Sequence, residues 1–141
     1  MKPDPAADMF LKMAQKDYTT LCKMVDDTEF AEEIFGFHAQ QAVEKAAKAM
    51  LANQGVSFER THDLEILFNA LYKQGCIKKT NFISLIDLTD FAVQYRYQAF
   101  DDMEAELDRA EIAIEVGKFL EHITKSCKRK TNKTTEKRRK D

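Results

Sequence analysis

The chain has 141 residues and a formal net charge of −2, and its 44% hydrophobic and 33% charged residues are typical of one soluble domain with a single core. Four glycines and two prolines are too few for a sheet with many hairpins, and no apolar run approaches the roughly 18 residues that span a bilayer. The three widely spaced cysteines form no Cys-x-x-Cys pair, so neither a disulfide scaffold nor a zinc site is indicated, and a reduced cytoplasm is favoured.

The first half of the chain predicts two helices. The first runs from about Asp4 to Val25, where apolar residues recur at spacings of three and four, the period of one helix face. The second begins at Asp27 or Thr28 and ends before Gly55, which is a suitable C-cap. Its 37–51 stretch, FHAQQAVEKAAKAML, is rich in good helix formers, and its alanines share one side, which would let another helix approach closely.

Polar side chains border the alanine face of this second helix. On a helical wheel the opposite side comprises Gln40, Gln41, Glu44, Lys45 and Lys48. His38 lies at the border, in line with Gln41 and Lys45. It is either a structural histidine bonded to a neighbouring helix or a half-buried site residue, and the other polar residues are either a solvated face or part of that site.

The third predicted helix starts at Thr61, a suitable N-cap, and ends at Gly75. His62 stands in its first turn. The exposed N–H groups of a helix start can hold an anion, so His62 belongs either to an anion site or to an ordinary cap with a surface imidazole.

The fourth predicted helix runs from Thr80 or Asn81 to Tyr95 or Tyr97, and it is apolar around most of its circumference, as expected of a buried helix. Arg96 nevertheless projects over its apolar side. Because an unpaired buried charge is costly, Arg96 makes either a salt bridge to another helix or an anion site, for which the planar fork of arginine suits phosphate.

A fifth helix is predicted from Asp101 or Asp102 to about Lys125, and a strongly basic segment follows it. Residues 125–141 hold nine basic and two acidic side chains, a net charge of +7, which leaves a net of −9 for residues 1–124. We therefore expect a helical bundle over 1–124 and a disordered basic tail over 125–141. The tail either follows the phosphates of a nucleic acid or is only a solvated end.

These elements predict an all-α fold, an antiparallel bundle of four to five helices with short connections. Glycine-rich phosphate loops, Gly-x-Ser-x-Gly, His-Glu-x-x-His and a repeated Glu-x-x-His pattern are all missing from the sequence, so we expect no metal or cofactor.

Three stretches resemble the HEPN domain family, the higher eukaryotes and prokaryotes nucleotide-binding domains. They are FHAQQAVEKAAKAML (37–51), THDLEILF (61–68) and FAVQYRY (91–97), and the resemblance covers about residues 6–124. It implies a bundle of four to five helices that usually dimerises. Many members of the family act with a minimal nucleotidyltransferase in a two-component module. Others are metal-independent ribonucleases that use an arginine, four to six residues and then a histidine.

That ribonuclease motif is not found in this sequence. Residues 101–103, where Arg96 would need its histidine, are Asp, Asp and Met, and neither Arg60 nor Arg109 has a histidine at the required distance. Without that imidazole the motif lacks its general acid or base. We therefore expect the non-catalytic branch of the family rather than an enzyme, with no catalytic residues.

The resemblance implies a homodimer that binds a nucleotide, a minimal nucleotidyltransferase, or both, in a toxin–antitoxin-like module. The cysteine content and the lack of a long apolar run favour the cytoplasm, with no membrane partner. The nucleotide-binding residues would be His38, Gln41, Lys45, His62, Tyr95, Arg96 and Tyr97. Arg96 would meet phosphate, and Tyr95 or Tyr97 would stack on a base. Two alternatives stay open: a ribonuclease toxin with an altered active centre, and a structural bundle whose basic tail binds RNA or DNA.

Overall fold

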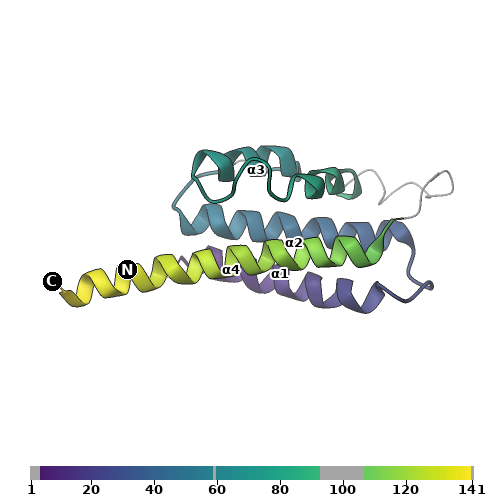
Figure 1. Cartoon of the computed structure of the whole chain (residues 1–141), viewed down its shortest axis with the longest axis horizontal. Helices are drawn as coiled ribbons and strands as arrows, with labels where there is room; N and C mark the ends of the chain where they lie inside the picture. Colours follow the sequence, from purple (N-terminus) through teal and green to yellow (C-terminus); the bar gives the residue numbers. More distant parts are fainter. Residues whose placement is uncertain (1–3, 59, 93–106, 141) are drawn as a thin grey trace.

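The fold is a helical bundle with one helix at its centre. The computed structural model describes residues 4–58, 60–92 and 107–140, with 129–140 described by their backbone alone. Its elements are α1 (Pro5–Met24), α2 (Glu32–Asn53), α3 (Leu64–Lys73), the 3₁₀ helix η1 (Ile83–Phe91) and α4 (Arg109–Lys140). The described residues contain no strand, which confirms the predicted all-α bundle (Figure 1).

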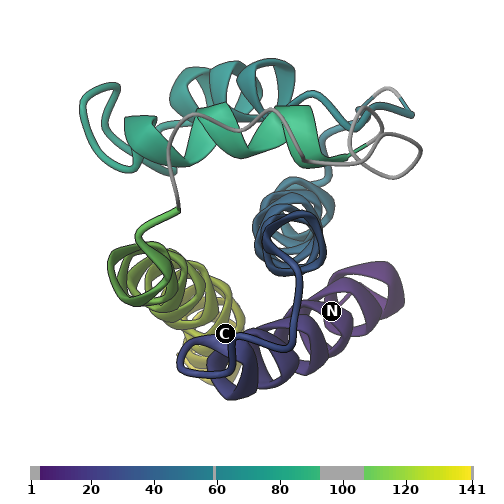
Figure 2. The ribbon, with the colours of Figure 1, turned by 90° about the vertical axis from the view of Figure 1, so that its right-hand side faces the viewer.

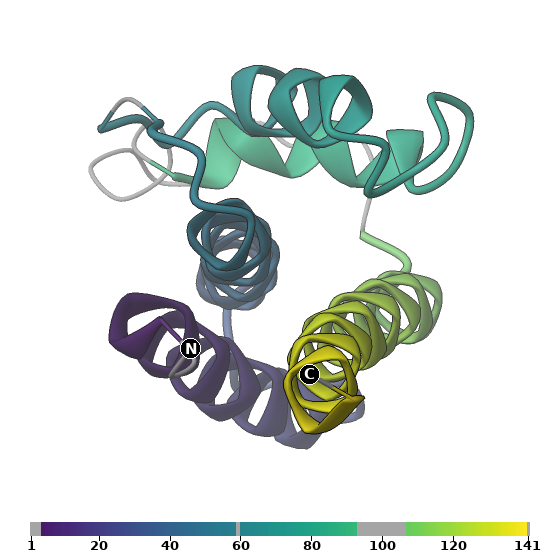
Figure 3. The ribbon, with the colours of Figure 1, turned by 90° about the vertical axis from the view of Figure 1, so that its left-hand side faces the viewer.

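The central helix is α2, which contacts every other element. Seen along the bundle, α3 and η1 form a layer on one side of α2, while α1 and α4 lie on the other side (Figures 2 and 3). The alanines at 39, 42, 46 and 49 are fully buried, as the wheel predicts for close helix packing. The opposite side is not a solvated face, however, because Gln40 and Glu44 are also buried beneath the start of α3.

The connection between α1 and α2 is longer than the sequence predicts. Asp4 caps α1 by accepting a hydrogen bond from the Ala6 N–H, and α1 ends at Met24. α2 begins only at Glu32, not at Asp27 or Thr28. The backbone between them makes separate turns, from the Asp27 N–H to the Met24 carbonyl and from the Phe30 N–H to the Asp27 carbonyl. The Asp27 and Phe30 carbonyls also accept hydrogen bonds from Arg109, a contact that holds this segment outside a continuous helix.

The cap of α3 differs from the prediction by two residues. Asp63, not Thr61, is the N-cap, and its carboxylate accepts a hydrogen bond from the Glu65 N–H. The Thr61 hydroxyl instead accepts from the Asp63 N–H, one step before the helix. At the other end Gly75 has a positive φ of 70°, so its predicted role in ending α3 is confirmed.

The predicted fourth α-helix is a 3₁₀ helix over its described part. η1 starts after Phe82, whose φ of 64° is left-handed. Three residues per turn place Leu85, Leu88 and Phe91 on one buried face, while Ile83 is 59% exposed. Burial on all sides is therefore wrong for η1. The predicted continuation to Tyr95 or Tyr97 lies outside the described residues.

The last helix starts later and ends later than the sequence predicts. Asp108 caps α4 by accepting from the Glu111 N–H, whereas the predicted caps Asp101 and Asp102 lie outside the described residues. The backbone stays helical through Lys140 and extends past the other helices (Figure 1). No glycine or proline interrupts residues 125–140, and lysine and arginine favour a helix, so the expected disorder is not what the backbone shows there.

Candidate functional site

Two polar side chains of α2 meet one carboxylate of α1. The oxygens of Asp17 accept hydrogen bonds from His38 Nδ1 at 3.0 Å and from Lys45 Nζ at 2.7 Å. His38 and Lys45 are seven residues apart, two helical turns, and so lie on one side of α2. The His38 side chain is 27% exposed, which places this Asp17 cluster at the edge of the α1–α2 contact.

A second cluster surrounds the buried carboxylate of Glu44, whose side chain is only 5% exposed. One oxygen accepts from Gln40 Nε2 at 3.0 Å and from His62 Nδ1 at 2.8 Å. The other accepts from Lys48 Nζ at 3.3 Å. A polar group removed from water is costly unless it is hydrogen-bonded, and these three donors replace the water that Glu44 loses by burial.

The two glutamines fasten this Glu44 cluster to its surroundings. Gln40 is fully buried, and its amide also donates to the His62 carbonyl at 3.3 Å. Its own oxygen accepts from Gln41 Nε2 at 2.6 Å. Gln41 therefore already has a partner, and it lies on the row of α2 that also carries His38 and Lys45.

His62 presents one side of its ring to solvent. Its side chain is 60% exposed, and within the described residues its Nε2 atom has no hydrogen-bond partner. The leading N–H groups of the helix start beside it already have hydrogen-bond partners within the described residues. The Leu64 N–H donates to the Thr89 hydroxyl, and the Glu65 N–H donates to Asp63.

The structure thus places four of the seven predicted site residues on or against one side of α2. His38 and Lys45 meet at Asp17, and His62 and Gln41 join through Gln40 and Glu44. The remaining three, Tyr95, Arg96 and Tyr97, lie outside the described residues. In these two clusters the charges of Lys45 and Lys48 are matched by those of Asp17 and Glu44.

Sequence reasoning did not identify Asp17, Gln40 and Glu44 as parts of a site. The i, i+4 spacing of Gln40, Glu44 and Lys48 was a local signal for their mutual contact. No local signal pointed to Asp17, because the face of α1 that meets α2 is fixed only by packing.

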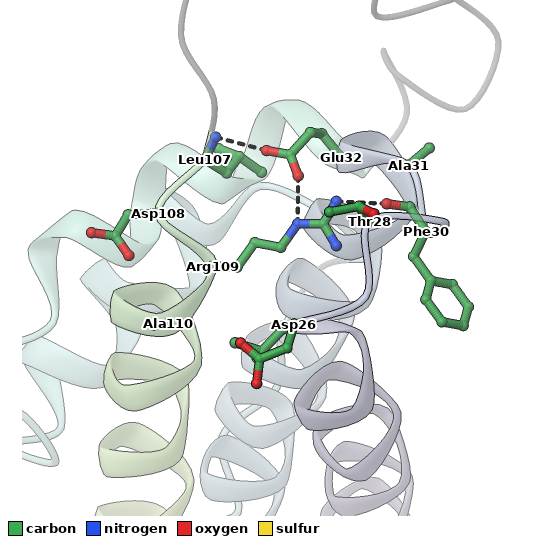
Figure 4. Close-up of a pocket in the computed structure, with 10 residues that line it drawn as sticks. Asp26, Thr28, Phe30, Ala31, Glu32, Leu107, Asp108, Arg109 and Ala110 are labelled. Carbon is green, nitrogen blue, oxygen red and sulfur yellow. Dashed lines mark hydrogen bonds and ion pairs between the residues drawn. The ribbon is translucent and has the colours of Figure 1, made fainter.

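Arg109 forms a third polar cluster at the end of the bundle where α2 begins. Its guanidinium donates to the Glu32 carboxylate and to the carbonyls of Met24, Asp27 and Phe30. The second Glu32 oxygen accepts from the Leu107 N–H at 2.7 Å (Figure 4). A cavity of about 570 Å³ lies beside these groups, between residues 25–32 and 107–110. Arg109 therefore fastens the α1–α2 connection to the start of α4.

Comparison with known proteins gives a family. The family model described as HEPN domain matches residues 7–130, most of the chain. This protein belongs to the HEPN domain family. No curated protein and no solved structure matches the chain. In this HEPN domain, the FHAQQAVEKAAKAML stretch forms most of the central helix, and THDL supplies the Asp63 cap and the imidazole on Glu44.

Two further findings concern the described part of this HEPN domain. None of its helices is long and apolar enough to cross a membrane. Nor does this part bring together three or more His, Cys, Asp or Glu side chains in a group that could hold a metal ion. The polar side of α2 and the neighbouring His62 together offer two imidazoles and two lysines, which are groups that can bind an anionic ligand.

Proposed function

We propose that this HEPN domain is a non-catalytic nucleotide-binding or accessory protein that acts with a minimal nucleotidyltransferase in a toxin–antitoxin-like module. The observation that carries the proposal is the convergence of His38 and Lys45 on the two oxygens of one carboxylate. Donors spaced to hold two oxygens of a carboxylate are also spaced to hold two oxygens of a phosphate. The sequence supports the non-catalytic part, because it lacks the Arg-x4–6-His motif.

In this proposal the two halves of a nucleotide meet different parts of the chain. His38 and Lys45 bind phosphate oxygens together with Arg96, whose guanidinium can hold two oxygens at once. Tyr95 or Tyr97 stacks on the base. Gln41 and His62 supply further hydrogen bonds along α2.

Calorimetric titration with ATP, GTP and their diphosphates tests this proposal. Arg96→Ala and Lys45→Ala should each weaken binding at least roughly tenfold, since each removes a charged donor to phosphate. Lys118→Ala is the matched control, because Lys118 is an exposed lysine of α4 paired only with Glu115. Equal heats in the wild type and Arg96→Ala would reject the role of Arg96, and no heat in either would reject nucleotide binding by the wild-type chain.

The partner is tested separately. A minimal nucleotidyltransferase encoded beside this chain should copurify with it, and light scattering should give the mass of an assembly that contains two copies of the chain. A monomeric mass with no retained partner would contradict both the homodimer and the two-component module.

The Glu44–His62 pair favours a second candidate function, a ribonuclease with an altered active centre. A neutral imidazole that donates from Nδ1 to Glu44 has its lone pair on Nε2, which faces solvent. Such a nitrogen can accept the proton of a ribose 2′-hydroxyl as that oxygen attacks the neighbouring phosphate. The bond from phosphorus to the 5′-oxygen of the next nucleotide then breaks, and the departing oxygen takes a proton from water or from the imidazolium. Glu44 would then be the positioning residue of this pair.

An RNA cleavage assay separates the two candidates. The altered-centre ribonuclease requires that His62→Ala abolish cleavage and that Glu44→Gln reduce it. If cleavage survives both His62→Ala and His38→Ala, these histidines are not the catalytic groups.

A further inference from the structure

We propose that Asp17 is an internal stand-in for the ligand phosphate, and that its carboxylate limits the affinity of the site until it is displaced. The inference rests on the proposed binding of a nucleotide at His38 and Lys45. It identifies a residue of α1, outside the predicted site, as the group that sets how tightly phosphate binds.

The hydrogen bonds of Asp17 are those that a phosphate would need. One oxygen takes the only hydrogen of His38 Nδ1, and the other holds Lys45 Nζ. Since Nδ1 can donate to one acceptor at a time, a phosphate bound at this nitrogen must replace the carboxylate. A phosphate bound at the other ring nitrogen would still lie close to the negative charge of Asp17, which opposes it.

The charges lead to the same conclusion. The single negative charge of Asp17 neutralises the positive charge of Lys45. With the carboxylate in place, the Asp17 cluster attracts an anion weakly. With the carboxylate rotated away, one lysine and one histidine face the ligand without a counter-ion.

The position of Asp17 on α1 allows this rotation. It lies at the edge of the contact with α2, and Met13 and Thr20, about one turn before and after it, are exposed. Within the described residues the carboxylate has no partner besides His38 and Lys45. A change of its two side-chain torsions can therefore carry it towards solvent while the backbone of α1 stays helical.

Calorimetric titration of the full chain with ATP and with inorganic tripolyphosphate tests the inference. Asp17→Asn removes the charge but keeps the shape, and it should bind both ligands roughly tenfold or more tightly than the wild type. Asp8→Asn is the matched control, because it makes the same change on the same helix at an exposed pair with Lys12. It should bind within about twofold of the wild type, since exposed pairs are screened by solvent.

The thermal midpoint supplies a second measurement. A saturating ligand should raise the midpoint of Asp17→Asn more than that of the wild type, because tighter binding stabilises the folded state further. Asp17→Ala, which favours a helix, replaces Asp17→Asn if the latter fails to fold.

The outcomes separate this inference from the proposed function. If the wild type binds as tightly as Asp17→Asn, or more tightly, the stand-in role is overturned and nucleotide binding is left intact. Tighter binding by the wild type would make Asp17 a positioning residue for His38 and Lys45. Binding by Asp17→Asn alone supports the stand-in role and shows that the wild-type site is closed to nucleotide. Failure of every variant to bind either ligand overturns both.

Discussion

Two glycines inside helices, Gly36 and Gly117, differ in what a Cβ atom added there would contact. A Cβ at Gly36 of α2 would collide with the ring of Phe91, which is buried in η1, whereas a Cβ at Gly117 of α4 would meet only the hydroxyl end of Tyr18. The ring of Phe91 is enclosed by the core and cannot retreat without moving η1. The end of the Tyr18 side chain is partly exposed and can swing aside.

Gly36→Ala should therefore lower the free energy of unfolding by about 1–3 kcal/mol, the usual cost of overpacking. This loss should outweigh the gain of roughly 1 kcal/mol that alanine brings to a helix interior. Gly117→Ala is the matched control and should change the free energy by less than about 1 kcal/mol. Urea denaturation measures both. Equal effects at the two positions would show that η1 does not press on α2 as described.

At the scale of single residues the sequence predicted part of the site. The alignment of His38 with Lys45 follows from helix geometry and is confirmed by their shared partner. Asp17 could not be found in this way, since its partners lie 21 and 28 residues further along the chain. Gln40 and Glu44 were placed on the outer side because a wheel cannot show that another segment covers that side.

Among the elements, the start of α4 depends most on one side chain. Arg109 donates to Glu32, to the Met24 carbonyl at the end of α1 and to two carbonyls of the α1–α2 connection, and its guanidinium lies 5.3 Å from the centre of the Phe35 ring. Arg109→Ala would leave these acceptors without their donor. We expect the free energy of unfolding to fall by about 2–3 kcal/mol, since the pair is mostly buried.

Two substitutions complete this test by urea denaturation. Arg109→Lys keeps the charge but loses the planar fork, so it should recover less than half of the loss. Lys118→Ala breaks an exposed pair with Glu115 and should cost less than about 0.5 kcal/mol. Full stability in Arg109→Lys would mean that charge alone holds the connection.

The elements themselves were predicted better than their boundaries. The late start of α2 depends on an arginine 82 residues away from Asp27, which no local pattern contains. The 3₁₀ character of η1 was missed although the segment contains a signal for it. Its polar residues Ser84, Asp87 and Asp90 stand three residues apart. Residues 83–91 become 3₁₀ through the spacing of three that buries Leu85, Leu88 and Phe91.

At the scale of the whole molecule, the two ends of α4 differ in burial and in charge. Within residues 109–128, whose side chains the structure describes, the last buried residue is Ile123. Residues 129–140 hold seven of the eleven basic side chains of α4. Deletion of 129–141 should therefore leave the free energy of unfolding within about 0.5 kcal/mol of the wild type. Urea denaturation measures this, and a larger loss would mean that the end of the helix packs on the bundle.

The same shortened chain tests the interaction-bundle alternative. If the basic tail binds RNA, its deletion lowers the RNA affinity. The fall of log affinity with log salt should also become less steep, by about 0.7 for each phosphate that the tail neutralises. RNA binding that is unchanged by the deletion would remove this alternative. The all-α architecture itself was predictable from the low content of glycine and proline and from the spacing of apolar residues.

The central position of α2 has a consequence for amide hydrogen exchange. Every other element packs against this helix, so its amides, from Ala39 to Ala47 above all, can exchange only when the whole bundle opens. A ligand held by His38 and Lys45 must then slow exchange along all of α2 by one common factor, set by its concentration and dissociation constant. Amide protection measured at any of these positions in α2 would therefore report how much of the protein has ligand bound at His38 and Lys45.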